Sequence, residues 1–251
     1  MESELVTPLV KNNPNGGYNP SVGILRGREG ADILAEYRAV VQNDYGNNSR
    51  LLVFHQEGEG LVTGSSSLAT VVLNDKVLRG RGLRVATLRD LELILKHRQD
   101  LELRGTYEDA GLALRSEAKP NEYLARNLTE QLKARDPRLQ YPILVNLTDC
   151  TLVKDPNARS SYGLVFKLRE DARPIHAPIL NNPKGSSFRS ADIDETTGLP
   201  RELSTEGNRS LWTIDSGLSR LCLDGDLDLN SYDGDLTYSC SDGRVVVVKV
   251  A

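Results

Sequence analysis

The feature that most constrains the fold is a change in hydrophobic periodicity near residue 149. Before it, apolar residues recur at spacings of three and four residues in several segments, which is the pattern of amphipathic helices. After it, short apolar runs alternate with clusters of Gly, Pro, Asn, Asp and Ser, as in strands separated by turns. The chain is therefore expected to combine helices and strands in its first part with a β-rich remainder.

Three segments of the first 150 residues have the helical pattern: 30–42, 88–98 with Thr87 as its N-cap, and 120–135. Strands are expected between and around them, at 21–25, 50–56, 68–78 (one or two strands with a turn at Asn74-Asp75), 110–116 and 141–147. The order strand, helix, strand across 110–147 predicts a crossover unit with two parallel strands.

After Asp149 we expect no helix. Short strands are predicted in "CTLVKD", "YGLVFKLRE", "RPIHAPIL", "SLWTID", "SRLCLDGDLDL" and "DGRVVVVKV". Residues 181–210 have few and scattered apolar residues, which predicts a long surface loop. The predicted fold class is α+β, with a mixed sheet, about three helices in the first 150 residues and a β-rich C-terminal part. We expect one domain over 1–251, with a β-rich subdomain at 149–251 as the alternative, and a buried Trp212.

Charge and cysteine content restrict the functional classes. The formal charge of −4 and the pI near 5.5 argue against a general nucleic-acid coat or a binder of anionic membranes. The densest basic segment, 79–98, has no interleaved aromatic residue for stacking on bases. The longest apolar run, "VVVV" at 245–248, is far too short for a membrane span. Three cysteines without a CxxC pair and the lack of a signal peptide predict free thiols and a cytoplasmic location.

The most conspicuous motif is "LCLDGDLDLNSYDGDLTYS", residues 221–239, with five aspartates in nineteen residues. An EF-hand loop beginning at Asp224 would need glycine at its sixth position and glutamate at its twelfth, where Leu229 and Asp235 stand. Alternating leucines and two Asp-Gly pairs favour strands joined by tight turns. A divalent-ion site of another type is the alternative.

The best candidate metal ligands are His55, Glu57 and Glu59 in "FHQEGEG". In a strand, these alternate residues point to one side, and an imidazole with two carboxylates suits Zn or Mn, or general acid–base chemistry. The alternative is that Gly58 and Gly60 end the strand and the polar groups face water.

A candidate anion site lies in "GILRGREGADIL", where Arg26, Gly27, Arg28 and Gly30 precede or open the first helix. Free amides at a helix N-terminus can hold a phosphate. The spacing matches neither the dinucleotide nor the P-loop fingerprint, which favours a plain strand-to-helix turn.

No nucleophile motif is present, because "TGSSSLA" lacks the G-x-S-x-G elbow. These observations favour a non-catalytic binding or interaction module that contacts a protein or a small-molecule ligand through the 181–210 segment. The alternative is a metal-assisted hydrolase of a phosphorylated or sugar substrate, with the His55 group as ligands.

Overall fold

The computed structural model describes residues 22–97, 101–181 and 186–250. The described residues form four α-helices: α1 (Gly27–Tyr45), α2 (Ser67–Leu73), α3 (Leu88–His97) and α4 (Glu122–Arg135). They also form fourteen strands: β1 (Val22–Ile24), β2 (His55–Glu57), β3 (Leu61–Thr63), β4 (Leu83–Val85), β5 (Glu108–Leu114), β6 (Ile143–Asn146), β7 (Cys150–Lys154), β8 (Leu164–Leu168), β9 (Ile175–His176), β10 (Ser186–Phe188), β11 (Arg209–Thr213), β12 (Leu218–Leu223), β13 (Leu229–Ser231) and β14 (Val246–Lys249). The α+β class is confirmed.

The strands form one large sheet and three smaller ones. The large sheet has the order β10-β11-β13-β12-β5-β6-β9, and its pairs are antiparallel except β11–β13. A three-stranded sheet has the order β1-β14-β4, and β2–β3 and β7–β8 are separate hairpins. Because β12 pairs with β5 and β14 lies between β1 and β4, strands from distant parts of the chain are neighbours in both sheets.

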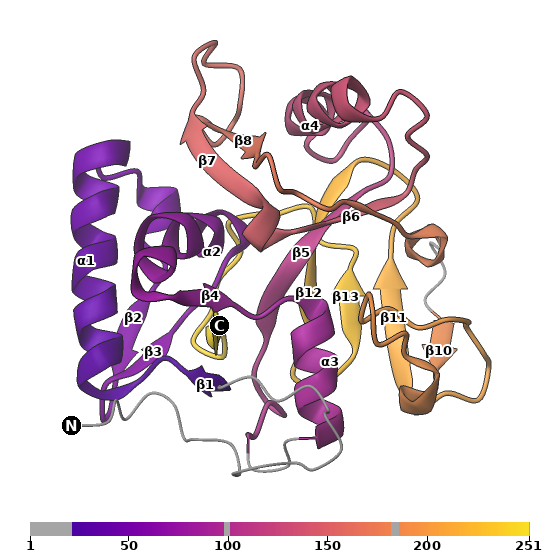
Figure 1. Cartoon of the computed structure of the whole chain (residues 1–251), viewed down its shortest axis with the longest axis horizontal. Coiled ribbons are helices and arrows are strands. Elements are labelled where there is room, and N and C mark those ends of the chain that lie inside the picture. The colour runs from indigo at the N-terminus through magenta and orange to yellow at the C-terminus, as the bar shows by residue number, and fades with distance from the viewer. Residues whose placement is uncertain (1–21, 98–100, 182–185, 251) are drawn as a thin grey trace.

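Two apolar cores lie on the two faces of the large sheet. One joins buried residues of α1, α2 and α4 with Leu112 and Leu114 of β5. The other joins α3 with Leu211, Leu221 and Leu229 of β11, β12 and β13. Figure 1 shows α3 in front of β12 and β13, and α1 at the opposite end of the molecule from β10. The β7–β8 hairpin projects from the top of this view.

The predicted parallel crossover at 110–147 is wrong. β5 and β6 are antiparallel, with Leu114 opposite Ile143 and Gly111 opposite Asn146. β6 therefore begins at the end of the sheet where β5 finishes. If the two strands were parallel, the connecting helix would have to run back along the length of the sheet. Instead, α4 lies above the end where β5 finishes and packs against β8 (Figure 1).

The strand predicted at 68–78 is also wrong, and the one predicted at 50–56 begins only at His55, in β2. Residues 49–51 form a 3₁₀ turn, and 67–78 form α2 followed by a π-helical turn. Ser66 begins the helix, because its Oγ accepts the Ala69 N–H at 3.3 Å. Every residue of α2 is buried, so its sequence is apolar all round and shows no helical period. A short run of this kind cannot be distinguished from a strand by periodicity.

The long-loop prediction for 181–210 holds only in part for the described residues 186–210, since most of 189–208 has neither an α-helix nor a named strand. Residues 186–210 contain β10 and a 3₁₀ turn, and Ile193 forms a bridge with Pro200. Phe188 and Leu199 are buried in the second core, so few apolar residues sufficed to order this segment. Trp212 was expected to be buried but is 47 % exposed. Adjacent side chains of β11 point to opposite faces, and it is Leu211 that points towards the core.

Candidate functional site

The aspartate-rich stretch forms most of one wall of a cavity of about 300 Å³. The lining comes from three segments: 105–107 before and at the start of β5, 220–225 at the end of β12, and 230–242 after the following turn. The motif that stands out in the sequence is therefore part of a cavity lined by carboxylate, guanidinium, phenol and thiol groups.

A bulge in β5 sets the direction of the charged side chains at this cavity. Leu221 pairs with Gly111 but Cys222 pairs with Asp109, so Ala110 is an extra residue in β5. Side chains alternate along a strand, so one extra residue reverses the faces of those that precede it. Asp109 therefore lies on the same face as Arg220, and Glu108 points into the core on the α3 side.

Arg220 and Asp109 form a buried ion pair behind the cavity. Nη2 of Arg220 lies 3.0 Å from Oδ1 of Asp109, and the side chains are 4 % and 0 % exposed. The hydroxyls of Ser65 and Ser67 also donate to this carboxylate, at 2.7 and 3.2 Å. Burial lowers the pKa of the Arg220 guanidinium, but the Asp109 carboxylate, together with Cys222, Tyr107 and Asp233, raises it above its ordinary value. Arg220 is therefore a fixed cation.

Two tyrosine rings hold the Arg220 guanidinium in place. Its Cζ lies 4.9 Å from the Tyr107 ring centroid and 5.1 Å from that of Tyr238. The Tyr107 hydroxyl donates to the carbonyl of Ser65 at 2.9 Å and accepts the N–H of Cys240 at 3.1 Å. Nη2 of Arg220 faces the Asp109 carboxylate, but Nε is buried without a hydrogen-bond acceptor among the described residues. The site thus contains a rigid cation whose donors are only partly used.

Three carboxylates, Asp224, Asp233 and Asp242, also line the cavity. Oδ1 of Asp224 accepts the backbone N–H groups of Asp226 and Asp228, at 3.1 and 2.9 Å, which closes the turn between β12 and β13. Burial raises the pKa of Asp224. The predicted strands and the turn between them are therefore present at 221–231. In addition, the carboxylates line the cavity.

Exposed aromatic rings extend the site across the sheet. Tyr232 lines the cavity and is 55 % exposed. Trp212 of β11 lies opposite Asn230 in the parallel register with β13, and its Nε1 donates to Asp228 at 3.4 Å. Together with Tyr238, 46 % exposed, these rings form a surface that we call the aromatic face: Trp212, Tyr232 and Tyr238.

The Cys222 thiol at the cavity is not activated. Cys222 is buried, and burial raises its pKa to about 12. It is therefore a neutral thiol near pH 7 and a poor nucleophile. All three cysteines lie among the described residues and are free, as predicted.

The structure does not gather the predicted metal ligands. His55 and Glu57 are exposed on β2, which pairs only with β3, and Glu59 follows in the exposed turn. Within the described ranges, no three His, Cys, Asp or Glu residues are arranged so that they could hold a metal ion. Gly58 and Gly60 have φ values of +47° and +85° and end the strand, as the alternative interpretation has it.

The predicted anion site lies at the start of α1. Arg26 and Arg28 are exposed, and Gly27 has a φ of +63°. The β2–β3 turn packs closely here, since a Cβ on Gly60 would lie 2.8 Å from the carbonyl oxygen of Gly27. Gly30 is buried under the same turn, with the Gly60 carbonyl oxygen 3.3 Å from its Cβ position. Close backbone packing therefore accounts for the glycines, and the anion site stays a prediction.

No protein-family model, no curated protein and no solved structure matches this chain. None of the helices in the described part has the length and apolar character needed to cross a bilayer. Function must therefore be inferred from the site itself.

Sequence reasoning singled out the stretch with Asp224 and Asp233 but interpreted it as solvated strands and turns, and it missed Tyr107, Arg220, Cys240 and Asp242. The available signal was an arginine in the apolar strand segment "LSRLCL". A charged residue at such a position is expected to have a buried partner, but the partner lies over one hundred residues earlier in the chain.

Proposed function

We propose that this protein is a non-catalytic binding protein for a neutral, hydroxyl-rich ligand of the carbohydrate class. The single observation that carries the proposal is the combination, in one cavity, of carboxylates that only accept hydrogen bonds and a guanidinium that only donates them. Each hydroxyl group of a sugar both donates and accepts, so one ligand can satisfy both kinds of group.

The aromatic face supports the same ligand class. Exposed aromatic side chains next to a cavity are typical of binding sites. The rings of Trp212 and Tyr232 offer flat apolar surfaces to the C–H faces of sugar rings. The carboxylates of Asp224, Asp233 and Asp242 repel phosphate groups, which disfavours a nucleic acid or a nucleotide at this site.

A cationic ligand fits less well. An ammonium group would pair with the carboxylates, but it would lie near the fixed charge of Arg220 and could not accept hydrogen bonds from it. A neutral ligand avoids this repulsion. The proposal also favours binding over catalysis, because the cavity thiol of Cys222 is protonated near neutral pH. The hydrolase alternative has no assembled metal-ligand group among the described residues.

We also propose a cytoplasmic location. Its support is the sequence-level argument together with the three free cysteines, two of which are buried. Thiol titration of the denatured, unreduced protein purified from its native compartment should give about three reactive groups. A count near one would mean that a disulfide forms there and would contradict the proposal.

The test uses Trp212, the only tryptophan of the chain, as a built-in reporter. A panel of soluble oligosaccharides is titrated while the tryptophan emission is followed, and calorimetry confirms each hit. At least one oligosaccharide should change the emission with saturation. Tyr232→Ala should weaken binding about tenfold, equivalent to about 1.4 kcal/mol.

Val153→Ala is the matched control, because Val153 is 40 % exposed on β7 and does not line the cavity. It should bind like the wild type. Spermidine and inorganic phosphate are tested in parallel as cationic and anionic probes. Saturable binding of either probe at this site, with none of any oligosaccharide, would show that the ligand class is wrong.

A further inference from the structure

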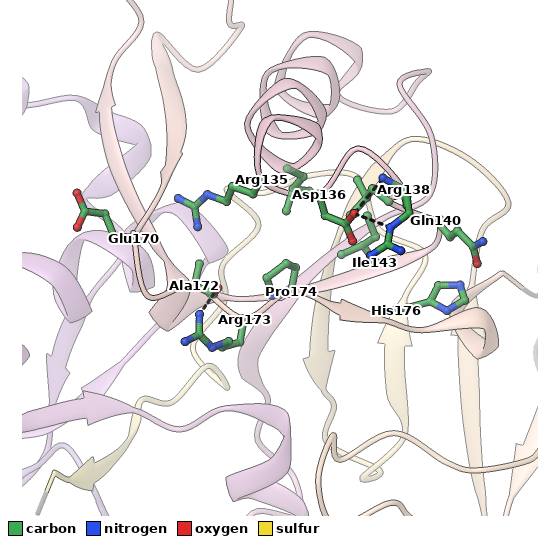
Figure 2. Close-up of a pocket in the computed structure, with 12 residues that line it drawn as sticks. Arg135, Asp136, Arg138, Gln140, Ile143, Glu170, Ala172, Arg173, Pro174 and His176 are labelled. Carbon is green, nitrogen blue, oxygen red and sulfur yellow. Dashed lines mark hydrogen bonds and ion pairs between the residues drawn. The ribbon is translucent and has the colours of Figure 1, made fainter.

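A second pocket lies between the end of α4 and the segment that joins β8 to β9 (Figure 2). Its volume is about 570 Å³, within the range of small-molecule sites. It shares no lining residue with the aspartate-rich cavity. The two pockets can therefore be tested independently.

The floor of this pocket is apolar. Leu132 of α4, Ile143 of β6 and Ala172 are buried there, and Pro174 lies beside them. Such a floor can cover the carbon skeleton of a ligand, while the polar groups at the rim determine which ligand binds.

The rim of the pocket is basic. Figure 2 shows the guanidinium groups of Arg135 and Arg173 on either side of Ala172, and Arg138 and His176 towards the other end. These residues come from three different segments: the last turn of α4, the residues after it, and the β8–β9 connection with β9. A basic residue in the last turn of a helix, such as Arg135, is explained by its favourable interaction with the helix dipole. The other basic residues of the rim have no such explanation.

Two carboxylates at the rim do not neutralise this charge. Oδ1 of Asp136 lies 3.7 Å from Nε of Arg138, whose side chain is 95 % exposed, so the pair is weak. The Glu170 carboxylate is directed away from Arg135 in Figure 2.

The guanidinium groups of Arg135 and Arg173 donate hydrogen bonds only to neutral oxygens among the described residues, and the Asp149 carboxylate attracts the charge of Arg173. Arg135 donates to the carbonyl of Leu168 at 3.1 Å, and Arg173 donates to the carbonyl of Ala172 at 3.4 Å. Among the described residues, neither forms an ion pair within 4.0 Å. Each guanidinium has five N–H donors, so most of them remain available.

We propose that this pocket binds a small organic anion that carries phosphate or carboxylate groups. Planar guanidinium groups bind both kinds of anion through paired hydrogen bonds, and here two of them lie at one end of an apolar floor. The pocket is thus opposite in charge to the aspartate-rich cavity, and its ligand is of a different class.

The experiment measures thermal unfolding and calorimetric binding with inorganic phosphate, a hexose phosphate and citrate, at constant ionic strength. We expect at least one of them to bind saturably and to raise the unfolding temperature. Binding of both phosphates without citrate identifies phosphate as the recognised group, and binding of citrate alone identifies carboxylate. Absence of saturable binding by all three would overturn the proposal.

The double variant Arg135→Gln/Arg173→Gln should bind at least about tenfold more weakly than the wild type. Arg159→Gln is the matched control for charge, because Arg159 is an exposed arginine between β7 and β8 outside the pocket. Equal weakening in this control would mean non-specific attraction and would contradict the site. His176→Ala, at an exposed position, provides a second measurement if the double variant fails to fold.

Discussion

Three buried arginines of the large sheet differ in how their donors are used. Arg115 donates to the carbonyl of Leu180 and to hydroxyls of its neighbours, and Arg209 forms two bonds of 2.7 Å with Glu92. Arg220 has a carboxylate partner for Nη2 but no acceptor for Nε. Buried donors are almost always satisfied, so Nε of Arg220 is an exception among the described residues.

Removal of the Arg220 charge should be strongly destabilising. Arg220→Met leaves Asp109 buried without its cation, which typically costs about 3–5 kcal/mol. The double variant Asp109→Asn/Arg220→Met should recover part of this loss, because no uncompensated charge remains. Urea unfolding of the four proteins of the cycle measures both effects. A double variant as unstable as the sum of the single variants would mean that the two residues are not coupled.

Glu108 should make stability depend on pH. Burial raises the pKa of its carboxyl to about 8, and Oε2 has no hydrogen-bond partner in the described structure. Between pH 4.5 and about 8 the native state keeps this proton while the unfolded state loses it, so stability falls as pH rises. A difference of one between the pKa values of the folded and unfolded states corresponds to about 1.4 kcal/mol of stability.

Glu108→Gln keeps an acceptor for the Thr106 hydroxyl, which donates to Oε1 at 2.8 Å, and cannot ionise. The free energy of unfolding of this variant should fall less between pH 5 and pH 8 than that of the wild type. Urea unfolding at the two pH values measures the difference. An identical decline in both proteins would show that Glu108 does not keep its proton in the native state.

At the scale of elements, the order of the 186–210 segment depends on close backbone contact. A Cβ added to Gly207 would lie 2.2 Å from the backbone nitrogen of Phe188 in β10. This contact holds the backbone around Gly207 against the edge strand β10 and keeps Phe188 buried. A segment with few apolar residues can therefore be ordered when its backbone packs without gaps.

Gly207→Ala should accordingly lower the free energy of unfolding by about 1–3 kcal/mol, the usual cost of overpacking. Gly80→Ala is the control, because a Cβ there meets no atom within 4 Å. It should be neutral or stabilise by up to about 1 kcal/mol. Chemical denaturation of both variants gives the comparison, and equal stabilities would mean that β10 moves to accommodate the methyl group.

At the scale of the whole molecule, strands from distant parts of the sequence hold the sheets together. β12 pairs with β5, and β14 lies between β1 and β4. Separation of the chain near residue 149 would break both arrangements. The expectation of a single domain remains a prediction, and the placement of the spectroscopic probes allows it to be tested.

The four α-helices of the described residues all lie between residues 27 and 135, whereas the only tryptophan lies in β11. Far-UV circular dichroism therefore reports mainly on the first part of the chain, and tryptophan emission reports on the second. If the chain unfolds as one cooperative unit, the two signals should give the same midpoint in urea. Separate midpoints would favour a subdomain at 149–251.

The sequence by itself determined the elements that are amphipathic. α1, α3 and α4 were predicted within a few residues, because one exposed and one buried face leave a period in the sequence. Strands such as β5, β6 and β14 are largely buried, and they were predicted as short apolar runs between turns. The free cysteines and the turns of the aspartate stretch also followed from local chemistry. In contrast, the sequence positions of His55, Glu57 and Glu59 did not show whether other metal-ligating groups would lie near them in the folded chain.

Only the tertiary structure decided the features that depend on contacts between distant residues. α2 is buried on all sides and has no period to detect, and the antiparallel return of β6 depends on where α4 packs. The cavity requires the bulge at Ala110, which turns Asp109 towards an arginine over one hundred residues away. A one-residue change of register reverses the face of every side chain before it, and no local pattern records such a shift.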